Sequence, residues 1–150
     1  TWMFIEWFGK GKPTAVGVAT GAVAGLVAIT PASGTAGPMG AIAIGFVSSI
    51  VCYIFAVRVK AMFGYDDSLD VFGVHGVGGI FGTIMIAVFG AGTWAAQLGG
   101  LAIVGIFTTV VTVVLVKVVG AFTSLRVDLE TETNGLDISV HGERAYDMSS

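Results

Sequence analysis

The chain has 150 residues, of which 55% are hydrophobic and only 11% are charged, against about 25% charged residues in an ordinary soluble domain. Its formal net charge is −3, and its seven Lys and Arg residues form no basic run. This composition argues against a soluble domain and against a nucleic-acid partner, and is typical of a polytopic membrane protein. The single Cys52 cannot form an intrachain disulfide and is most simply a small apolar residue.

The first residues, Trp2 to Phe8, are hydrophobic and aromatic. A signal peptide would begin with basic residues, which are absent here. We interpret residues 1–9 as the end of a membrane helix whose earlier part is absent from the chain.

Two long stretches lack Asp, Glu, Lys and Arg, one from Pro13 to Val57 and one from Val71 to Val116. Each is about twice the roughly 20 residues that cross a bilayer, so each should cross twice. Helix-breaking residues interrupt them at 30–38 and 90–94. The sequence therefore predicts an all-α membrane helix bundle, in which residues 1–124 form the transmembrane part and residues 125–150 a tail. The expected helices after the first cover about residues 14–30, 39–58, 70–90 and 96–122.

The charged residues then fall on one side of the predicted bundle. Lys10, Lys12, Arg58 and Lys60 flank helix ends there, whereas both opposite turns have no basic residue. By the positive-inside rule that side is the cytoplasm. We expect a multi-pass protein of the plasma or inner membrane with a cytoplasmic C-terminal tail.

The segment at residues 66–79, DDSLDVFGVHGVGG, carries the most information in the chain. Asp70 and Ser68 are candidate N-cap residues for the helix that follows, and carboxylates interact favourably with a helix N-terminus. Asp67 would lie near the cytoplasmic mouth, although a solvated loop charge is an equally good interpretation. The glycines around the histidine leave space for a crossing helix or for a conduit.

His75 lies inside a charge-free stretch, where an ionisable side chain is costly to bury. An intramembrane imidazole can be a satisfied structural group, or it can carry or relay a proton near neutral pH. The second interpretation is favoured here. A metal site is not expected, because no second His, Cys or carboxylate shares the buried face.

These residues resemble the Amt/Mep/Rh ammonium transporter family, and its Amt branch in particular. The segment at 66–79 is similar to the family signature around the second of its paired pore histidines. Two other motifs agree in order and spacing: residues 21–34, GAVAGLVAITPASG, and a tail with LRV at 125–127, GLD at 135–137, HGE at 141–143 and Ala145-Tyr146. The resemblance covers essentially the whole chain. Ile86-Ala87 and a short turn at 90–94 depart from it.

The resemblance implies an eleven-helix protomer built from two inverted five-helix repeats and a last helix, assembled as a homotrimer with one pore per subunit. This chain would supply the end of helix seven, helices eight to eleven and the tail. His75 would be one of the two pore histidines and Val71 would line the same hydrophobic passage. Asp67, and with it Asp70, would be structural near the pore entrance.

The resemblance also implies a regulatory role for the tail, which would dock on the cytoplasmic face and work alongside a PII-type signal protein. The residues expected to hold it there are Gly135, Asp137, His141 and Glu143. Ser139 could accept phosphate, although a plain surface serine is the simpler interpretation.

The function that follows is conduction of NH4+/NH3 through a hydrophobic pore, without covalent chemistry and without a cofactor, so the chain is not expected to be an enzyme. Two alternatives stay open. One is an ammonium sensor that uses the same fold, which flux measurements on the full-length protein would separate. The other is an unrelated inverted-repeat transporter of another solute.

Overall fold

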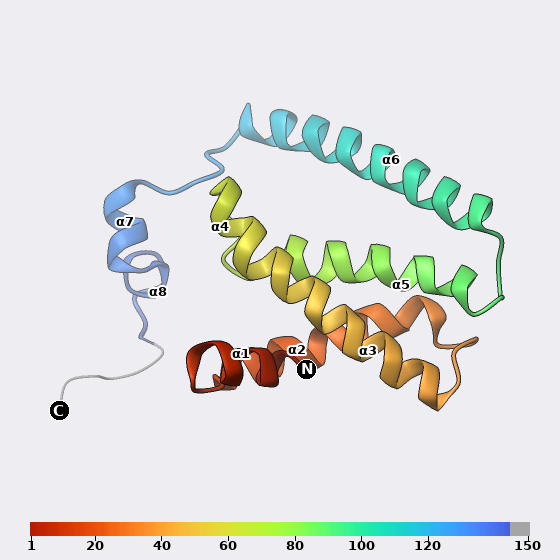
Figure 1. The fold of residues 1–150 in the computed structure, drawn as a ribbon. Helices are drawn as coiled ribbons and strands as arrows, with labels where there is room; N and C mark the ends of the chain where they lie inside the picture. The colour runs from red at the N-terminus through yellow and green to blue at the C-terminus, as the bar shows by residue number, and fades with distance from the viewer. Residues whose placement is uncertain (145–150) are drawn as a thin grey trace. The chain divides into compact units, whose positions relative to one another are not determined.

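The computed structural model describes residues 1–144, and in these residues all regular structure is helical (Figure 1). The α-helices are α1 (Trp2–Lys10), α2 (Ala15–Ile29), α3 (Pro38–Tyr53), α4 (Lys60–Phe63), α5 (Val77–Val88), α6 (Trp94–Gly120), α7 (Leu129–Asn134) and α8 (Leu136–Ser139). A 3₁₀ turn, η1 (Thr30–Ala32), follows α2. A π-helical segment, η2 (Ile54–Val59), connects α3 to α4, and a second one, η3 (Val71–Gly76), precedes α5. The predicted all-α class is confirmed. The Ala145-Tyr146 motif lies outside the described residues.

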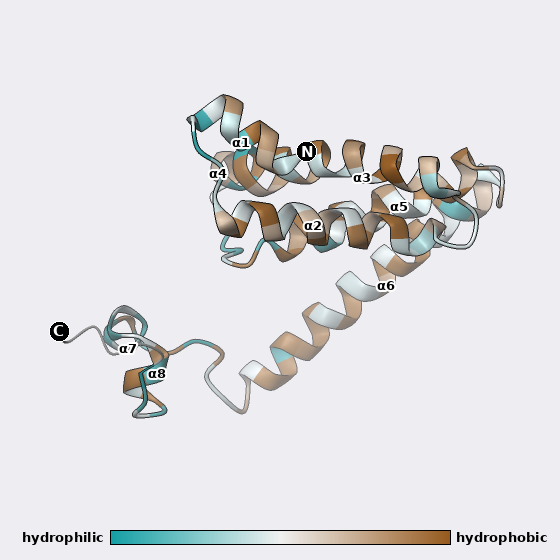
Figure 2. Ribbon diagram, turned by 90° about the horizontal axis from the view of Figure 1, so that it is seen from below, coloured by the Kyte–Doolittle hydropathy of each residue, from teal (hydrophilic) through white to brown (hydrophobic). Residues whose placement is uncertain are grey.

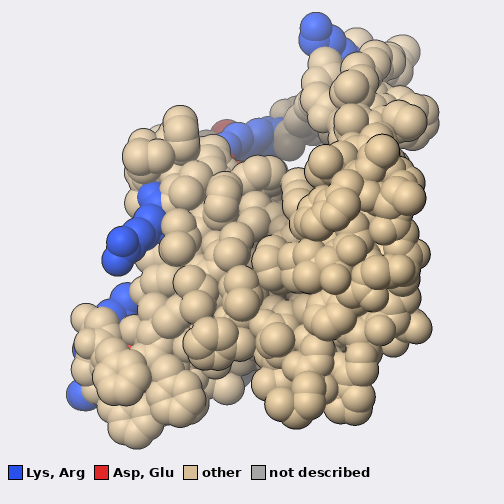
Figure 3. All heavy atoms as spheres, turned by 45° about the vertical axis from the view of Figure 1, so that its right-hand side comes forward, with Lys and Arg blue, Asp and Glu red and all other residues tan. Residues whose placement is uncertain are grey.

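Within residues 1–144, four helical stretches are long and apolar enough to cross a membrane: Ala15–Ala32, Pro38–Phe63, Val71–Val88 and Trp94–Gly120. In Figure 2 these helices are mostly brown or white, and the teal residues concentrate at their ends and in the tail. The face of the molecule in Figure 3 is largely made of uncharged residues. These stretches correspond to the four spans expected from the gaps between charges. The second is longer than expected, because the helix continues through Arg58 and Lys60 before Gly64, at φ 63, ends it.

The chain forms two compact units, Thr1–Val104 and Gly105–Ser150. In the first unit, α2 packs on both α3 and α5. The contacts are made by small residues. A Cβ on Gly25 would lie 3.8 Å from the Cα of Gly45, and a Cβ on Gly82 would lie 2.2 Å from the carbonyl oxygen of Ala28. Close backbone approach replaces the hydrophobic drive that is missing between helices in lipid.

A buried carboxylate joins α1 to α2. Glu6 is 5% exposed, and its Oε2 accepts hydrogen bonds from the backbone N–H and the hydroxyl of Thr14, each at 2.9 Å. Thr14 is the N-cap of α2, and its Oγ1 accepts from the N–H of Gly17 at 2.9 Å. A Cβ at Gly17 would lie 2.3 Å from the Glu6 carboxylate, so a larger residue at this position would displace the carboxylate. The first turn of α2 is therefore fixed by α1.

The second unit contains most of α6 and the short tail helices. None of the 27 residues of α6 is buried in the structure. Asp128 caps α7, accepting from the N–H of Thr131 at 2.8 Å and from its hydroxyl at 3.0 Å. Gly135 lies between α7 and α8 at φ 97, a conformation that favours glycine. The division of the chain into a membrane part and a tail at residue 124 stays a prediction.

Candidate functional site

His75 lies in the π-helical segment η3, close to the start of the apolar stretch Val71–Val88. The side chain is exposed and, within residues 1–144, makes no hydrogen bond. It opens onto a recess of about 310 Å³ in the first unit, whose walls come from α2 and from the start of the third span. The other lining residues are Val16, Ala19, Thr20, Val23, Leu69 and Val74.

The recess is apolar except for two side chains. Thr20 donates its hydroxyl hydrogen to the carbonyl of Val16 at 2.8 Å, so its oxygen keeps acceptor capacity. The imidazole of His75 keeps both nitrogens available. A polar group with unmet hydrogen bonds beside an apolar wall can bind a small hydrogen-bonding solute or pair with another side chain. Val71 is 55% exposed and does not line this recess.

The start of η3 is held by Asp67 and Lys60. Asp67 accepts the backbone N–H of Val71 at 2.8 Å and that of Phe72 at 2.9 Å. Lys60 donates to the carbonyl of Asp67 at 3.0 Å and pairs with the carboxylate of Asp70. The cap expected from Asp70 or Ser68 is thus made by Asp67, whose two oxygens reach the free N–H groups of the first turn.

Asp70 does not cap η3 and instead pairs with Lys60. It is the residue before η3, its backbone lies at φ 53, and its side chain makes no cap hydrogen bond. A left-handed conformation directs the carboxylate to Lys60, at the end of the second span, and away from the helix N-terminus. Aspartate tolerates this conformation better than most residues do. The pair therefore ties the second span to the third.

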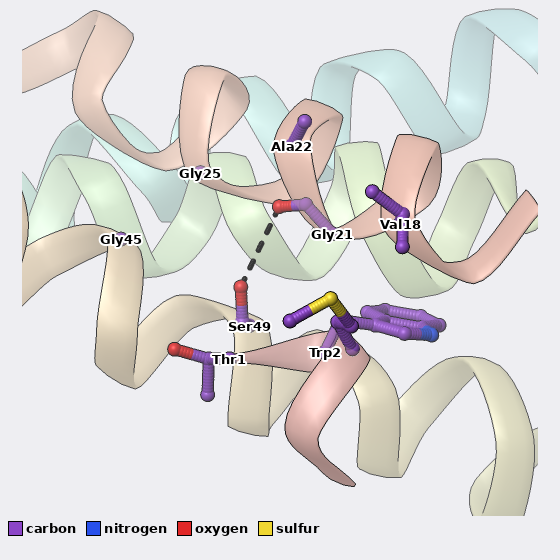
Figure 4. Close-up of a pocket in the computed structure, with 9 residues that line it drawn as sticks. Thr1, Trp2, Val18, Gly21, Ala22, Gly25, Gly45 and Ser49 are labelled. Atoms are coloured by element: carbon purple, nitrogen blue, oxygen red, sulfur yellow. Dashed lines mark hydrogen bonds between the residues drawn. The ribbon is translucent and has the colours of Figure 1, made fainter. Parts of the chain in front are cut away.

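A second recess of about 310 Å³ lies between α1, α2 and α3 (Figure 4). Gly21, Gly25 and Gly45 leave its walls without side chains, and Ser49 donates to the carbonyl of Gly21 at 3.5 Å. Apart from the hydroxyls of Thr1 and Ser49, the lining is small or apolar. It offers no side chain that titrates near neutral pH. The recess at His75 is therefore the better candidate site.

The tail residues form a compact local structure. A Cβ at Gly135 would lie 2.7 Å from Oδ1 of Asp137, and the N–H of Glu143 donates to the carbonyl of Asp137 at 3.0 Å. Asp137, His141 and Glu143 have exposed side chains in the second unit. The predicted docking of these residues on the membrane part stays a prediction.

Two features of the site were not foreseen from the sequence. The wall opposite His75 comes from α2, including Thr20, which reads as an ordinary residue of an apolar helix. In the sequence Lys60 indicates only the topology, whereas in the structure it is also the partner of Asp70. The sequence signal for the pair of Lys60 and Asp70 was the presence of a basic residue, Lys60, and of acidic residues that include Asp67 and Asp70 where one predicted span ends and the next begins.

Comparison with known proteins decides the family. The model of the Ammonium Transporter Family matches residues 1–146. The chain belongs to this family. An ammonium transporter of Aquifex aeolicus is 44% identical over 98% of the chain, and one of Bacillus subtilis is 41% identical over 99% of it. These ranges cover 38% and 41% of the two relatives, so the chain spans about two fifths of their length.

The fold agrees with a solved member of the family. The crystal structure of Candida albicans Mep2 superposes on this chain with a TM-score of 0.71 at 33% identity, covering 86% of this chain and 33% of Mep2. The resemblance drawn from the three motifs is therefore confirmed at the level of the family and the fold. Together with the four apolar helices, family membership makes the chain a multi-pass membrane protein.

Proposed function

We propose that this chain is the C-terminal part of an ammonium transporter that moves NH4+/NH3 through a hydrophobic pore containing His75. The observation that carries the proposal is an imidazole with no hydrogen-bond partner in residues 1–144, facing an apolar recess in a member of this family. Relatives named as ammonium transporters supply the substrate class.

The chemistry follows from the cost of desolvation. Ammonium is strongly hydrated, and an apolar passage strips that water without replacing it. A neutral imidazole nitrogen can accept a proton from NH4+, leaving NH3 to pass along the apolar wall. The proton then needs a return path, which a second imidazole in hydrogen-bond contact with His75 would provide. Alkali cations have no proton to give and are excluded.

The partner of His75 is assigned to a histidine of the preceding repeat. No polar side chain of its own helix can serve, because the positions three and four residues away are Phe72, Val71, Gly78 and Gly79. Val71 is assigned to the same passage. Asp67 and Asp70 keep the start of η3 in place, as their contacts with the backbone and with Lys60 suggest.

The proposal also covers the assembly. The functional unit is a homotrimer with cytoplasmic C-termini, regulated through the tail by a PII-type protein. Basic residues near the helix ends on one side support the orientation. A sensor that uses the same fold remains the second candidate, and measured flux separates the two.

The test is His75→Ala in the full-length transporter, reconstituted in vesicles. We expect the variant to remain trimeric and to lose most selective ammonium flux, because the proton acceptor is gone. Ile80→Ala, which shortens a side chain that is 47% exposed on the same helix, is the matched control and should conduct normally. A folded His75→Ala trimer with normal rate and selectivity would show that the pore-histidine assignment is wrong.

A further inference from the structure

Two π-helical segments pack against each other, and one of them contains His75 of the candidate site. η2 interrupts the second span, η3 forms the beginning of the third, and the two are in contact. A π-helical turn inserts an extra residue into a helix and changes the direction of the side chains that follow it, and such turns occur frequently at functional sites. His75 is part of η3, so its direction depends on this turn.

The contact between them is made at Gly73 and Ala56. A Cβ built on Gly73 would lie 2.8 Å from both the Cα and the backbone nitrogen of Ala56, and 3.0 Å from its Cβ. Real Cβ atoms do not approach a backbone this closely, and a backbone cannot move aside as a flexible side chain can. Gly73 is buried and Ala56 is 2% exposed, so η3 lies directly on η2 here.

Neighbouring contacts fix the same interface. The thiol of Cys52, two residues before η2, lies 3.8 Å from the carbonyl of Val74 as a weak donor. The rings of Phe55 and Phe72 meet edge to face with centroids 6.4 Å apart. These contacts flank Gly73 and leave η3 little freedom to slide.

Gly73 and His75 point in nearly opposite directions. Two residues are separated by about 200° around an α-helix of 3.6 residues per turn, and by somewhat less in a π-helical turn. Gly73 faces η2, whereas His75 faces the recess formed with α2. Any atom added between Gly73 and Ala56 therefore displaces the imidazole toward the opposite wall of the recess.

We propose that Gly73, packed against Ala56, is a positioning residue that sets the depth and direction of the His75 imidazole in the conducting passage. The inference rests on the proposed function and adds the device that holds the histidine in place. The missing Cβ lets the two π-helical turns meet at backbone distance.

The experiment compares three glycine substitutions in the full-length transporter in vesicles. Gly73→Ala fills the contact with η2. Gly79→Ala, on the same span, is the matched control, because a Cβ there has nothing within 4 Å in the described chain. Gly82→Ala places a Cβ 2.2 Å from the carbonyl of Ala28 and tests a clash of the helix crossing away from the histidine. The readouts are trimer yield, maximal flux, its pH profile and selectivity over K+.

We expect Gly73→Ala to form trimers and to conduct at least tenfold more slowly, with a shifted pH profile or lower selectivity. Gly79→Ala should stay within twofold of the unmodified transporter. Gly82→Ala should lower the trimer yield while the surviving trimers keep the normal pH profile, because its clash is structural. A Gly73→Ala variant that keeps the normal rate and profile, or that loses yield alone, overturns the inference.

A second variant covers the case in which Gly73→Ala does not assemble. Ala56→Gly removes the methyl group from the contact and loosens it without a clash, so it should fold and shift the pH profile. An unchanged profile overturns the inference. Failure of the proposed function looks different, since His75→Ala would then conduct normally, whereas failure of this inference leaves His75→Ala inactive.

Discussion

Glu6 shows how one residue can fix the angle between two helices. Its carboxylate is 5% exposed and takes both hydrogen-bond donors of Thr14, at the point where α2 has free N–H groups. From the sequence, Glu6 counts only as a charge on the cytoplasmic side. Its burial follows from a contact with Gly17, eleven residues along, whose missing side chain cannot be interpreted before the helices are placed.

Replacing this carboxylate should destabilise the full-length protein. Glu6→Ala leaves the N–H and hydroxyl of Thr14 without their acceptor, and hydrogen bonds to charged groups contribute about 1.5–3 kcal/mol each. We expect a lower apparent Tm in thermal unfolding of the purified full-length protein. Lys12→Ala, at an exposed position just after the same helix, is the control and should leave the Tm unchanged. Equal Tm values for the two variants would contradict the role given to Glu6.

The aspartates before His75 show what the sequence can and cannot predict at single positions. The segment with Asp67 and Asp70 was correctly expected at the start of a span, because carboxylates suit a helix N-terminus. Which of them makes the cap depends on backbone conformation. Asp70 adopts φ 53 and turns to Lys60, which leaves the cap to Asp67.

At the level of elements, the spans were predictable and their interruptions were not. The charge-free stretches and the helix-breaking residues near positions 31 and 90 predict four helices. In residues 1–144 the structure has four apolar helical stretches close to the predicted ranges. Hydrophobic periodicity over a uniformly apolar stretch carries no sign of an extra residue in a turn. The π-helical segments η2 and η3, and the contact of Gly73 with Ala56, therefore had to come from the structure.

Two carboxylates with lowered pKa values predict that the stability of the tail helix α7 depends on pH. Hydrogen bonds from Thr131 lower the pKa of Asp128, and the hydrogen bond and charge of Arg126 lower the pKa of Glu132. A carboxylate with a lowered pKa in the folded state stabilises that state above its ordinary pKa of about 4, and the effect is lost as the pH falls through the lowered value.

Acid should therefore loosen α7. A spin label at position 133 in the full-length protein should become more mobile between pH 5 and pH 2, as measured by electron paramagnetic resonance. Glu132→Gln removes the pair with Arg126, so this variant should have a more mobile label at pH 7 and a smaller change with acid. A label whose mobility does not depend on pH would show that these two carboxylates do not hold the helix.

At the scale of the whole molecule, the predicted regulatory role of the tail can be tested only in the full-length transporter. Gly135 adopts φ 97, and a Cβ there would lie 2.7 Å from the Asp137 carboxylate, so Gly135→Ala distorts the turn between α7 and α8. We expect Gly135→Ala and Asp137→Ala each to lower ammonium uptake by cells without lowering the amount of transporter in the membrane. Ser139→Ala, at an exposed hydroxyl, is the control. Normal uptake in both tail variants would refute a regulatory role.

The hydrogen bonds between Glu6 and Thr14 also have a consequence for folding during synthesis. The two residues are eight positions apart, so they emerge together during translation. Gly82 reaches Ala28 only after the third span has been synthesised. The corner between α1 and α2 can thus close while later spans are still entering the bilayer, so the carboxylate meets its donors before the bundle is complete.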